Sequence, residues 1–202
     1  MNELQSKLDF RREARGRRAA MSNRESASAR ILDQVFATVE YQAAQRVLFY
    51  VGIGHEVATL PHLQTALAAA KTVFVPLCLD NELQLFELRS FDELVARTLG
   101  IPEPREELWS IRERFADVRT IDLAVIPGLA FGRDGTRIGQ GRGYYDRLLA
   151  RGEPGRPVRL AVAFECQVFD HVASTPRDAL MDAIITESQV YTRTPASIHF
   201  TK

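Results

Sequence analysis

The sequence predicts an α/β fold: a single three-layer α/β/α domain, residues 1–202, with a largely parallel sheet. Three observations predict it. Short apolar runs of strand length recur along the chain, segments with helical patterns or caps separate them, and most of the runs are apolar at nearly every position. A strand that is apolar throughout is typical of a parallel sheet buried on both faces. The length is that of one ordinary domain.

The first part of the chain is predicted to be helical. Residues 2–21 are rich in arginine and read as one helix. Ser22 is followed three residues later by Glu25, which is the pattern of a capping box and predicts a second helix running to about Tyr41. Apolar residues recur at helical spacing within it, so one face of this helix is expected to pack on the sheet.

Six apolar runs are predicted as strands, at residues 46–51, 72–77, 83–88, 121–127, 158–165 and 182–187. Helices are expected between several of them. Thr59 begins one that runs through Ala70, Ser90 and Glu93 form a capping box that opens a short one to about Leu99, and residues 145–151 form another. Residues 105–120 are charged and match no element.

Composition narrows the class of protein. Lys+Arg and Asp+Glu both number 26, and this balance argues against a dedicated nucleic-acid binder. The charged N-terminal residues lack the apolar core of a signal peptide, and no run approaches the length of a membrane helix. Cys78 and Cys166 lie in apolar surroundings, lack CxxC spacing and are interpreted as buried free thiols of a reducing compartment. We therefore expect a cytoplasmic protein.

The most informative segment is rich in glycine. Gly139, Gly141 and Gly143 alternate with other residues, so the backbone can turn freely and a ligand can approach its N–H groups. Arg137 precedes them and Tyr144-Tyr145-Asp146 follow. Arginine suits phosphate oxygens and aspartate suits magnesium. The segment therefore contains the parts of a nucleotide-phosphate site, although a flexible surface loop is the alternative.

This segment differs from the common phosphate-binding loops. A Walker A loop would continue with Lys-Ser/Thr where Tyr144-Tyr145 stands. In a Rossmann fold the glycines directly follow a strand, whereas here eleven residues separate Pro127 from Gly139. A helix that starts at the last glycine would still offer free N–H groups to an anion.

Four basic residues, Lys7, Arg11, Arg15 and Arg18, fall on one face of the first predicted helix. Such a face is either solvated or a cationic wall for a phosphate chain. Like charges four residues apart on a helix repel each other, so the arrangement has a cost that a bound anion would relieve.

Several further side chains are candidates with two interpretations each. Glu56 lies beyond a predicted strand, where ligands bind in α/β sheets, but a capping or surface role is also open. Asp178 and Asp182 are either a magnesium pair or solvated acids. Trp109 is either exposed or stacked on a ligand. The four histidines lack ligand spacing, and we assign them no role.

Five motifs in order resemble one family. They are K-x-x-F-R-x-x-x-R-x-x-R-x-x-M-S from Lys7, the segment from Tyr50 through Glu56 to Thr59, Gly100-Ile-Pro-Glu-Pro104, the signature PGLAFGRDGTRIGQGRGYYD from Pro127, and DAIITE from Asp182. Together they resemble the 5-formyltetrahydrofolate cyclo-ligase family, also called methenyltetrahydrofolate synthetase. Phe10 and Met21 stand where the family has leucine, and Gln140 and Arg142 fill variable positions.

The resemblance implies an enzyme that converts 5-formyltetrahydrofolate and MgATP to 5,10-methenyltetrahydrofolate, ADP and phosphate, on a fold similar to ribose-5-phosphate isomerase and CoA-transferases. It implies three groups of site residues. ATP would contact Lys7, Arg11, Arg137, Gly139, Gln140, Gly141, Arg142, Gly143, Tyr144 and Tyr145, and folate would contact Val51, Glu56 and the segment Gln140–Tyr144. Magnesium would be held by Asp146 and Asp182, and Arg142, Tyr144 and Asp146 would act in catalysis.

The residue types suit this reaction. Transfer of a phosphoryl group to the formyl oxygen makes that oxygen a leaving group, so N10 can attack the carbon. Phosphoryl transfer depends on positioning and charge neutralisation and needs no protein nucleophile. We expect a monomer, with a dimer possible, that binds no nucleic acid and no membrane. The rival hypotheses are a folate- or nucleotide-binding relative without turnover and a sugar-phosphate or CoA-handling enzyme on the same fold.

Overall fold

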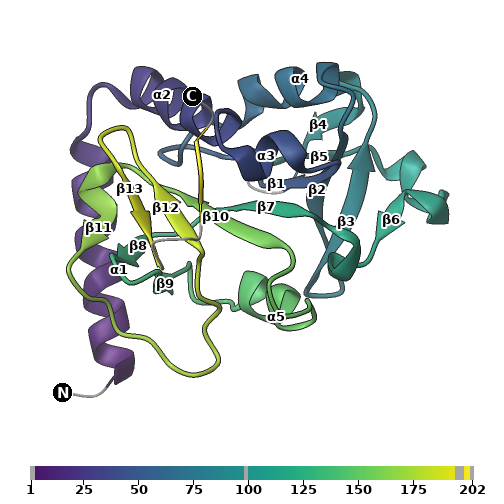
Figure 1. The fold of residues 1–202 in the computed structure, drawn as a ribbon. Coiled ribbons are helices and arrows are strands. Elements are labelled where there is room, and N and C mark those ends of the chain that lie inside the picture. Colours follow the sequence, from purple (N-terminus) through teal and green to yellow (C-terminus); the bar gives the residue numbers. More distant parts are fainter. Residues whose placement is uncertain (1–2, 98–99, 194–197, 201–202) are drawn as a thin grey trace.

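The computed structural model describes residues 3–97, 100–193 and 198–200, and in this part of the chain an eight-stranded sheet lies between helices (Figure 1). The strand order is β13-β12-β10-β7-β1-β2-β3-β6. The strands are β1 (Arg46–Phe49), β2 (Thr72–Leu79), β3 (Glu82–Leu88), β6 (Phe115–Ala116), β7 (Leu123–Ile126), β10 (Val158–Val162), β12 (Ala183–Ile185) and β13 (Val190–Thr192).

The centre of the sheet is parallel and its edges are antiparallel. β12, β10, β7, β1 and β2 pair in parallel. The pairs β12–β13, β2–β3 and β3–β6 are antiparallel. The predicted largely parallel sheet is therefore confirmed, and the carboxyl ends of its central strands meet at one edge, which is where ligands bind in such folds.

Helices cover both faces of the sheet, as the apolar strands predicted. Side chains alternate between the faces, so Val47 and Phe49 pack with one set of helices and Leu48 with another. The first face carries α2 (Arg24–Phe36), α3 (Val39–Ala43) and α4 (Leu60–Ala68), and the second carries α5 (Tyr144–Ala150).

A second, smaller sheet brings the N-terminal helix to the glycine segment. It consists of β11 (Val168–Phe169), β8 (Ala130–Gly132) and β9 (Arg137–Ile138). Helix α1 (Glu3–Ala20) packs on it, because Ala14 is buried against Ala130 and Ile138. Figure 1 shows α1 lying beside this small sheet at one side of the molecule. The basic face of α1 and the residues after β9 thus become neighbours.

Two predicted helix starts are wrong. Helix α2 begins at Arg24, with Asn23 rather than Ser22 before it and no side-chain cap. It ends at Phe36, and Thr38 then caps α3.

After Ser90 there is only a single 3-10 turn, followed by β4 (Leu94–Ala96) paired with β5 (Pro102–Pro104). The predicted end of that helix, Leu99, lies outside the described residues.

Ser90 does cap the 3-10 turn, because its hydroxyl accepts from the Asp92 backbone N–H at 3.4 Å, but the chain leaves the helical path after Glu93. The carboxylate of Glu93 makes one tertiary and one local contact. It accepts hydrogen bonds from Arg114 Nη2 at 2.5 Å and from the Arg89 backbone N–H at 3.0 Å. Arg114 is 2% exposed and so ties the charged segment 105–120 to the edge of the sheet. The rest of that segment forms 3-10 turns, Glu106–Ser110, Arg112–Arg114 and Val118–Thr120.

Three smaller expectations are resolved. Cys78 is exposed rather than buried, because it lies near the hairpin turn that joins β2 to β3, whereas Cys166 is partly buried. Trp109 donates to the Pro104 carbonyl and carries Arg97 over its ring, so it packs locally. No helix in the described residues has both the length and the apolar character needed to cross a bilayer.

Candidate active site

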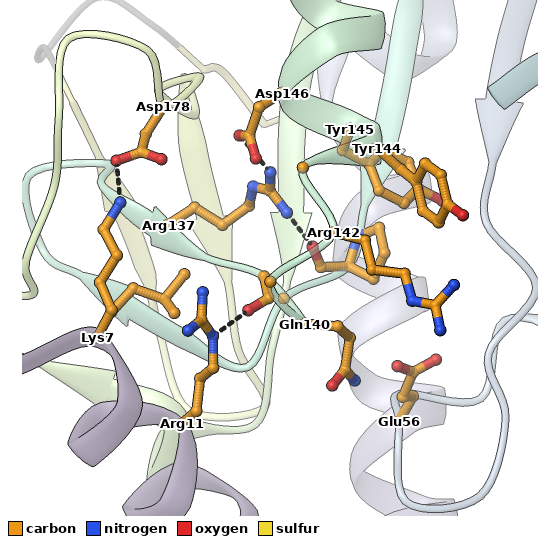
Figure 2. Close-up of a pocket in the computed structure, with 16 residues that line it drawn as sticks. Lys7, Arg11, Glu56, Arg137, Gln140, Arg142, Tyr144, Tyr145, Asp146 and Asp178 are labelled. Carbon is orange, nitrogen blue, oxygen red and sulfur yellow. Dashed lines mark hydrogen bonds and ion pairs between the residues drawn. The ribbon is translucent and has the colours of Figure 1, made fainter. Parts of the chain in front are cut away.

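A cavity of about 320 Å³ opens at the carboxyl end of β7. Pro127 and Gly128, which follow that strand, line it together with residues from four other parts of the chain. Helix α1 contributes Lys7 and Arg11, the segment after β1 contributes Glu56, and the loop before β12 contributes Asp178. The whole segment 137–146 lines the rest, so the glycine segment forms the largest part of the wall (Figure 2).

The glycines are required by the backbone path and by close packing. Gly141 and Gly143 have φ of +105° and +66°, which lie in the left-handed region that other residues avoid. A Cβ on Gly139 would lie 3.0 Å from Arg137 Nη1, and one on Gly141 would lie 3.4 Å from Arg11 Cζ. Gln140, Gly141 and Arg142 are exposed, while Gly139 and Gly141 lie against Arg137 and Arg11, so the segment is a surface loop held between two arginines.

The basic face of α1 is directed at this segment. Lys7 Nζ lies 2.5 Å from Asp178 Oδ2, Arg11 Nε donates to the Gly139 carbonyl at 2.9 Å, and Arg15 Nη2 donates to Gln140 Oε1 at 2.7 Å. Lys7 and Arg11 line the cavity and form a cationic wall there, whereas Arg15 is exposed to solvent and Arg18 is buried away from the cavity lining.

Arg137 and Asp146 form a second, more buried ion pair. Arg137 Nη2 lies 2.6 Å from Asp146 Oδ1, and the arginine side chain is 2% exposed. Its Nη1 donates to the Pro127 carbonyl at 3.2 Å, but its Nε is buried without a partner. A buried donor without an acceptor destabilises the folded protein, so the position of Arg137 at the cavity wall costs stability.

Asp146 and Asp178 each use a single carboxylate oxygen for their hydrogen bonds within the protein. Asp146 Oδ1 also accepts from the Ala179 backbone N–H, and Asp178 Oδ2 also accepts from the backbone and the hydroxyl of Thr175. Within the described residues, the other oxygen of each carboxylate has no protein partner. Burial would raise the pKa of Asp178, but the hydrogen bonds from Lys7 and Thr175 outweigh it and hold the pKa below its usual value. Asp178 therefore stays ionised.

These two carboxylates fit a magnesium ion. Magnesium is usually held by one or two protein carboxylates, with phosphates and water supplying the other ligands. Asp146 and Asp178 line the same cavity, and each has one carboxylate oxygen without a protein partner, which matches that requirement. The described residues contain no cluster of three or more His, Cys, Asp or Glu that would by itself enclose a metal.

Glu56 has a different environment on the opposite side of the cavity. Burial raises its pKa, while the Ile53 backbone N–H, Arg18 and the Gln140 amide oppose that rise. In Figure 2, the side chains of Glu56, Gln140 and Arg142 lie together on one side of the glycine segment, and Lys7, Asp178 and Asp146 lie on the other. The cavity thus has an end with two ion pairs and an end with a single carboxylate.

Two expected site residues lie elsewhere. Asp182 stands at the start of β12, away from the edge where the strands end, and its Oδ2 accepts from the Arg159 backbone N–H at 2.8 Å. Its carboxylate is thus used to join β12 to β10, and the loop residue Asp178 lines the cavity instead. Val51 is 7% exposed and packs in the core rather than in the cavity wall.

The other expected residues line the cavity: Lys7, Arg11, Glu56, Arg137, Gly139, Gln140, Gly141, Arg142, Gly143, Tyr144, Tyr145 and Asp146. Sequence reasoning missed the hydrogen bond between Arg15 and Gln140 and the burial of Arg18. Helical spacing placed both arginines on the correct face, and that was the available signal.

Fold and site together define the class of protein: an α/β protein with a cavity lined by basic side chains, a glycine segment and two carboxylates. The model of the 5-formyltetrahydrofolate cyclo-ligase family matches residues 3–187, and the chain belongs to this family. This confirms the resemblance seen in the sequence motifs and favours a cyclo-ligase over a sugar-phosphate or CoA-handling enzyme.

Individual relatives agree with the family assignment. The chain is 28% identical over 192 residues to 5-formyltetrahydrofolate cyclo-ligase of Mus musculus, covering 90% of this chain and 94% of the relative. The solved structure of Aquifex aeolicus 5,10-methenyltetrahydrofolate synthetase is similar with a TM-score of 0.81 and 27% identity over 94% of each chain. The Mycoplasma pneumoniae synthetase, at 18% identity and a TM-score of 0.68, shares the fold over 93% of this chain and 99% of its own.

Proposed function

We propose that this enzyme uses MgATP to convert 5-formyltetrahydrofolate to 5,10-methenyltetrahydrofolate, with release of ADP and phosphate. One observation carries the proposal. The basic face of α1 and the glycine segment, more than 120 residues apart in sequence, meet at one cavity that also contains two carboxylates with free oxygens. Family membership supplies the substrate class.

The phosphate chain of ATP is assigned to the end with the two ion pairs. Lys7, Arg11 and Arg137 supply positive charge there, and the glycine segment supplies backbone N–H groups that a ligand can approach. Asp146 and Asp178 would hold the magnesium ion that neutralises the phosphates, with Asp178 taking the place expected for Asp182. Tyr145 lies beneath the segment, with Arg137 over its ring at 5.8 Å, and keeps the loop in place.

The folate is assigned to the end that contains Glu56. A pterin ring presents neighbouring N–H donors, and a carboxylate accepts from such an edge. In Figure 2, Gln140 lies between Glu56 and Arg11, while Arg142 and Tyr144 lie on the Glu56 side of the segment; the formyl group and the γ-phosphate would meet near these side chains. The exposed Arg142 has room to contact the transferred phosphoryl group.

The chemistry follows from this placement. The formyl oxygen takes the γ-phosphoryl group and ADP leaves, so the formyl carbon becomes electrophilic. N10 then attacks that carbon, and phosphate departs with the former formyl oxygen. The protein positions the two substrates and stabilises the negative charge that develops on the phosphoryl oxygens.

The test is direct. The purified protein is mixed with 5-formyltetrahydrofolate, ATP and magnesium, and the near-ultraviolet absorbance of the methenyl product is followed. We expect absorbance to rise only when all three are present, and no rise at saturating substrates would contradict the proposal. Tight binding of both substrates without ADP release would instead indicate a binding protein without turnover.

We also propose that the enzyme works in the cytoplasm as a monomer. Cys78 and Cys166 are both free thiols, which suits a reducing compartment. Gel filtration with light scattering tests the oligomeric state.

A further inference from the structure

Arg147 on α5 connects the glycine segment to the hairpin formed by β2 and β3. Its Nη1 donates to the Arg142 carbonyl at 2.8 Å, and its Nη2 donates to the Asn81 carbonyl at 3.0 Å. Arg142 lines the cavity, whereas Arg147 is exposed and lies outside the cavity lining. Arg147 can therefore act on the cavity only through the segment that it holds.

The hairpin is a firm anchor for this contact. Leu79 pairs with Glu82 in the antiparallel register, so only Asp80 and Asn81 form the turn. Both turn residues have positive φ, +50° and +61°, as a tight two-residue hairpin turn requires. Figure 1 shows α5 next to this end of the hairpin. The Asn81 carbonyl is thus held in place by the main sheet.

Arg147 also packs along the end of the glycine segment. A Cβ on Gly143, which has a φ of +66°, would lie 3.2 Å from Arg147 Nη1. The Arg147 guanidinium carbon lies 5.3 Å from the centre of the Tyr144 ring. At the other end of the segment, Arg11 donates to the Gly139 carbonyl. The segment is therefore held by one arginine at each end, and each arginine binds a backbone carbonyl.

The side chain of Arg142 depends on this backbone contact for its placement. In the part of the chain that the structure describes, the Arg142 guanidinium makes no hydrogen bond or ion pair. Its position relative to the cavity is then set by the backbone that carries it. A guanidinium donates from both terminal nitrogens in a fixed planar geometry, so one side chain can hold two carbonyls at a set spacing. Arg147 uses that geometry to tie the Arg142 backbone to the hairpin.

We propose that Arg147 is a positioning residue that fixes the backbone from which Arg142 reaches the transferred phosphoryl group. The inference rests on the proposed function, in which Arg142 contacts that group. Arg147 touches neither substrate and acts through the Arg142 carbonyl. A contact to the transferred phosphoryl group is strongest in the transition state, so losing Arg147 lowers kcat more than it weakens the binding of MgATP.

The first test replaces Arg147 and separates turnover from binding. Arg147→Met keeps most of the aliphatic stem and removes both donors. We expect kcat for methenyl formation to fall about tenfold, as when one hydrogen bond that orders a site is lost. Calorimetry with a non-hydrolysable MgATP analogue should show a nearly unchanged Kd. Arg147→Lys has a single donor nitrogen that cannot replace the two-pronged contact, so it should recover little of kcat.

Arg151→Met is the matched control. Arg151 lies one helical turn further along α5, is also exposed, and contacts the same hairpin through the Leu83 carbonyl at 3.1 Å and Glu82 at 3.4 Å. It ties α5 to the sheet without touching the glycine segment. Arg151→Met should therefore lower the Tm about as much as Arg147→Met does, and it should leave kcat unchanged.

A double-mutant cycle tests whether Arg147 acts through Arg142. Arg142→Met removes the side chain that is proposed to contact the phosphoryl group. In this background, Arg147→Met should lower kcat by clearly less than it does in the wild-type protein, because the side chain that it positions is absent. Losses that simply multiply would overturn the inference.

The remaining outcomes separate this inference from the proposed function. If the wild-type protein forms no methenyl product, the proposed function fails and the inference fails with it. If the wild-type protein is active and Arg147→Met lowers kcat no more than Arg151→Met, only the positioning role is overturned. Full activity in Arg147→Lys would also overturn it, because the positive charge alone would then explain the effect.

Discussion

Arg137 Nη2 and Asp146 Oδ1 lie 2.6 Å apart at the inner wall of the cavity, and this pair joins the two ends of the glycine segment. Arg137 belongs to β9 and Asp146 to the first turn of α5. The pair fixes the path of the three glycines between them and occupies only one oxygen of Asp146. The same contact therefore shapes the segment and leaves an oxygen for a metal.

The dependence of activity on magnesium should separate Asp146 from Asp182. Asp146→Asn keeps the shape but weakens metal binding, so half-maximal activity should require at least about tenfold more magnesium. Asp182→Asn should lower stability by about 1 kcal/mol, since it weakens the bond to Arg159, and leave the magnesium requirement unchanged. A magnesium titration of initial rates checks both, and the opposite pattern would restore Asp182 as the ligand.

Lys7 should matter for the nucleotide and not for the folate. Lys7→Met removes a charge-assisted contact to phosphate, and kcat/KM for MgATP should fall about ten- to a hundredfold. The KM for 5-formyltetrahydrofolate should change little, because Lys7 lies at the other end of the cavity (Figure 2). Steady-state kinetics with each substrate varied in turn measure this. Equal effects on both substrates would argue against the two-ended arrangement.

Asp178 should make stability depend on pH. Its pKa in the folded protein is depressed, so its ion pair with Lys7 stabilises the fold above the usual aspartate pKa, and this stability is lost as pH falls through the folded pKa. Asp178→Asn should thus lower the free energy of unfolding by about 1–2 kcal/mol at neutral pH. Urea denaturation at neutral and strongly acidic pH should show a difference between variant and wild type that shrinks in acid. A difference that does not depend on pH would contradict the ion-pair explanation.

Gly141 should tolerate no side chain. Its φ of +105° means that Gly141→Ala strains the segment by about 1–2 kcal/mol, at a point in contact with the Arg11 guanidinium. MgATP binding should weaken with little effect on the rest of the fold. Gly16→Ala on α1 is the control, because nothing lies within 4 Å of the added carbon, and it should keep or raise the Tm. Unchanged nucleotide binding in Gly141→Ala would mean that the segment does not contact phosphate.

The sequence predicted the centre of the fold better than its edges. Strands such as Leu123–Ile126 are buried at every position, so their apolar runs are unambiguous. Ser90 and Glu93 show why the edges failed: Ser90 caps a 3-10 turn, but the chain then continues as a strand and Arg114 pairs with the Glu93 carboxylate. A pattern of four residues cannot reveal a partner that lies 21 residues away.

The site was predictable where the backbone demanded particular residues. The alternating glycines and the basic helical spacing both reflect local geometry, and the glycines, Lys7 and Arg11 line one cavity. Asp178 and Asp182 could not be told apart, because either could face the cavity depending on where the loop ends and β12 begins. The burial of Arg18 depends on tertiary packing, which helical spacing does not report.

The central claim is that this cavity couples ATP cleavage to cyclisation of the folate. The most direct test is to measure ADP and methenyl product in the same reaction under magnesium and saturating substrates. We predict equal amounts of the two products throughout, and neither product when 5-formyltetrahydrofolate or magnesium is left out. Methenyl product without ADP, or no methenyl product at all, would contradict the claim.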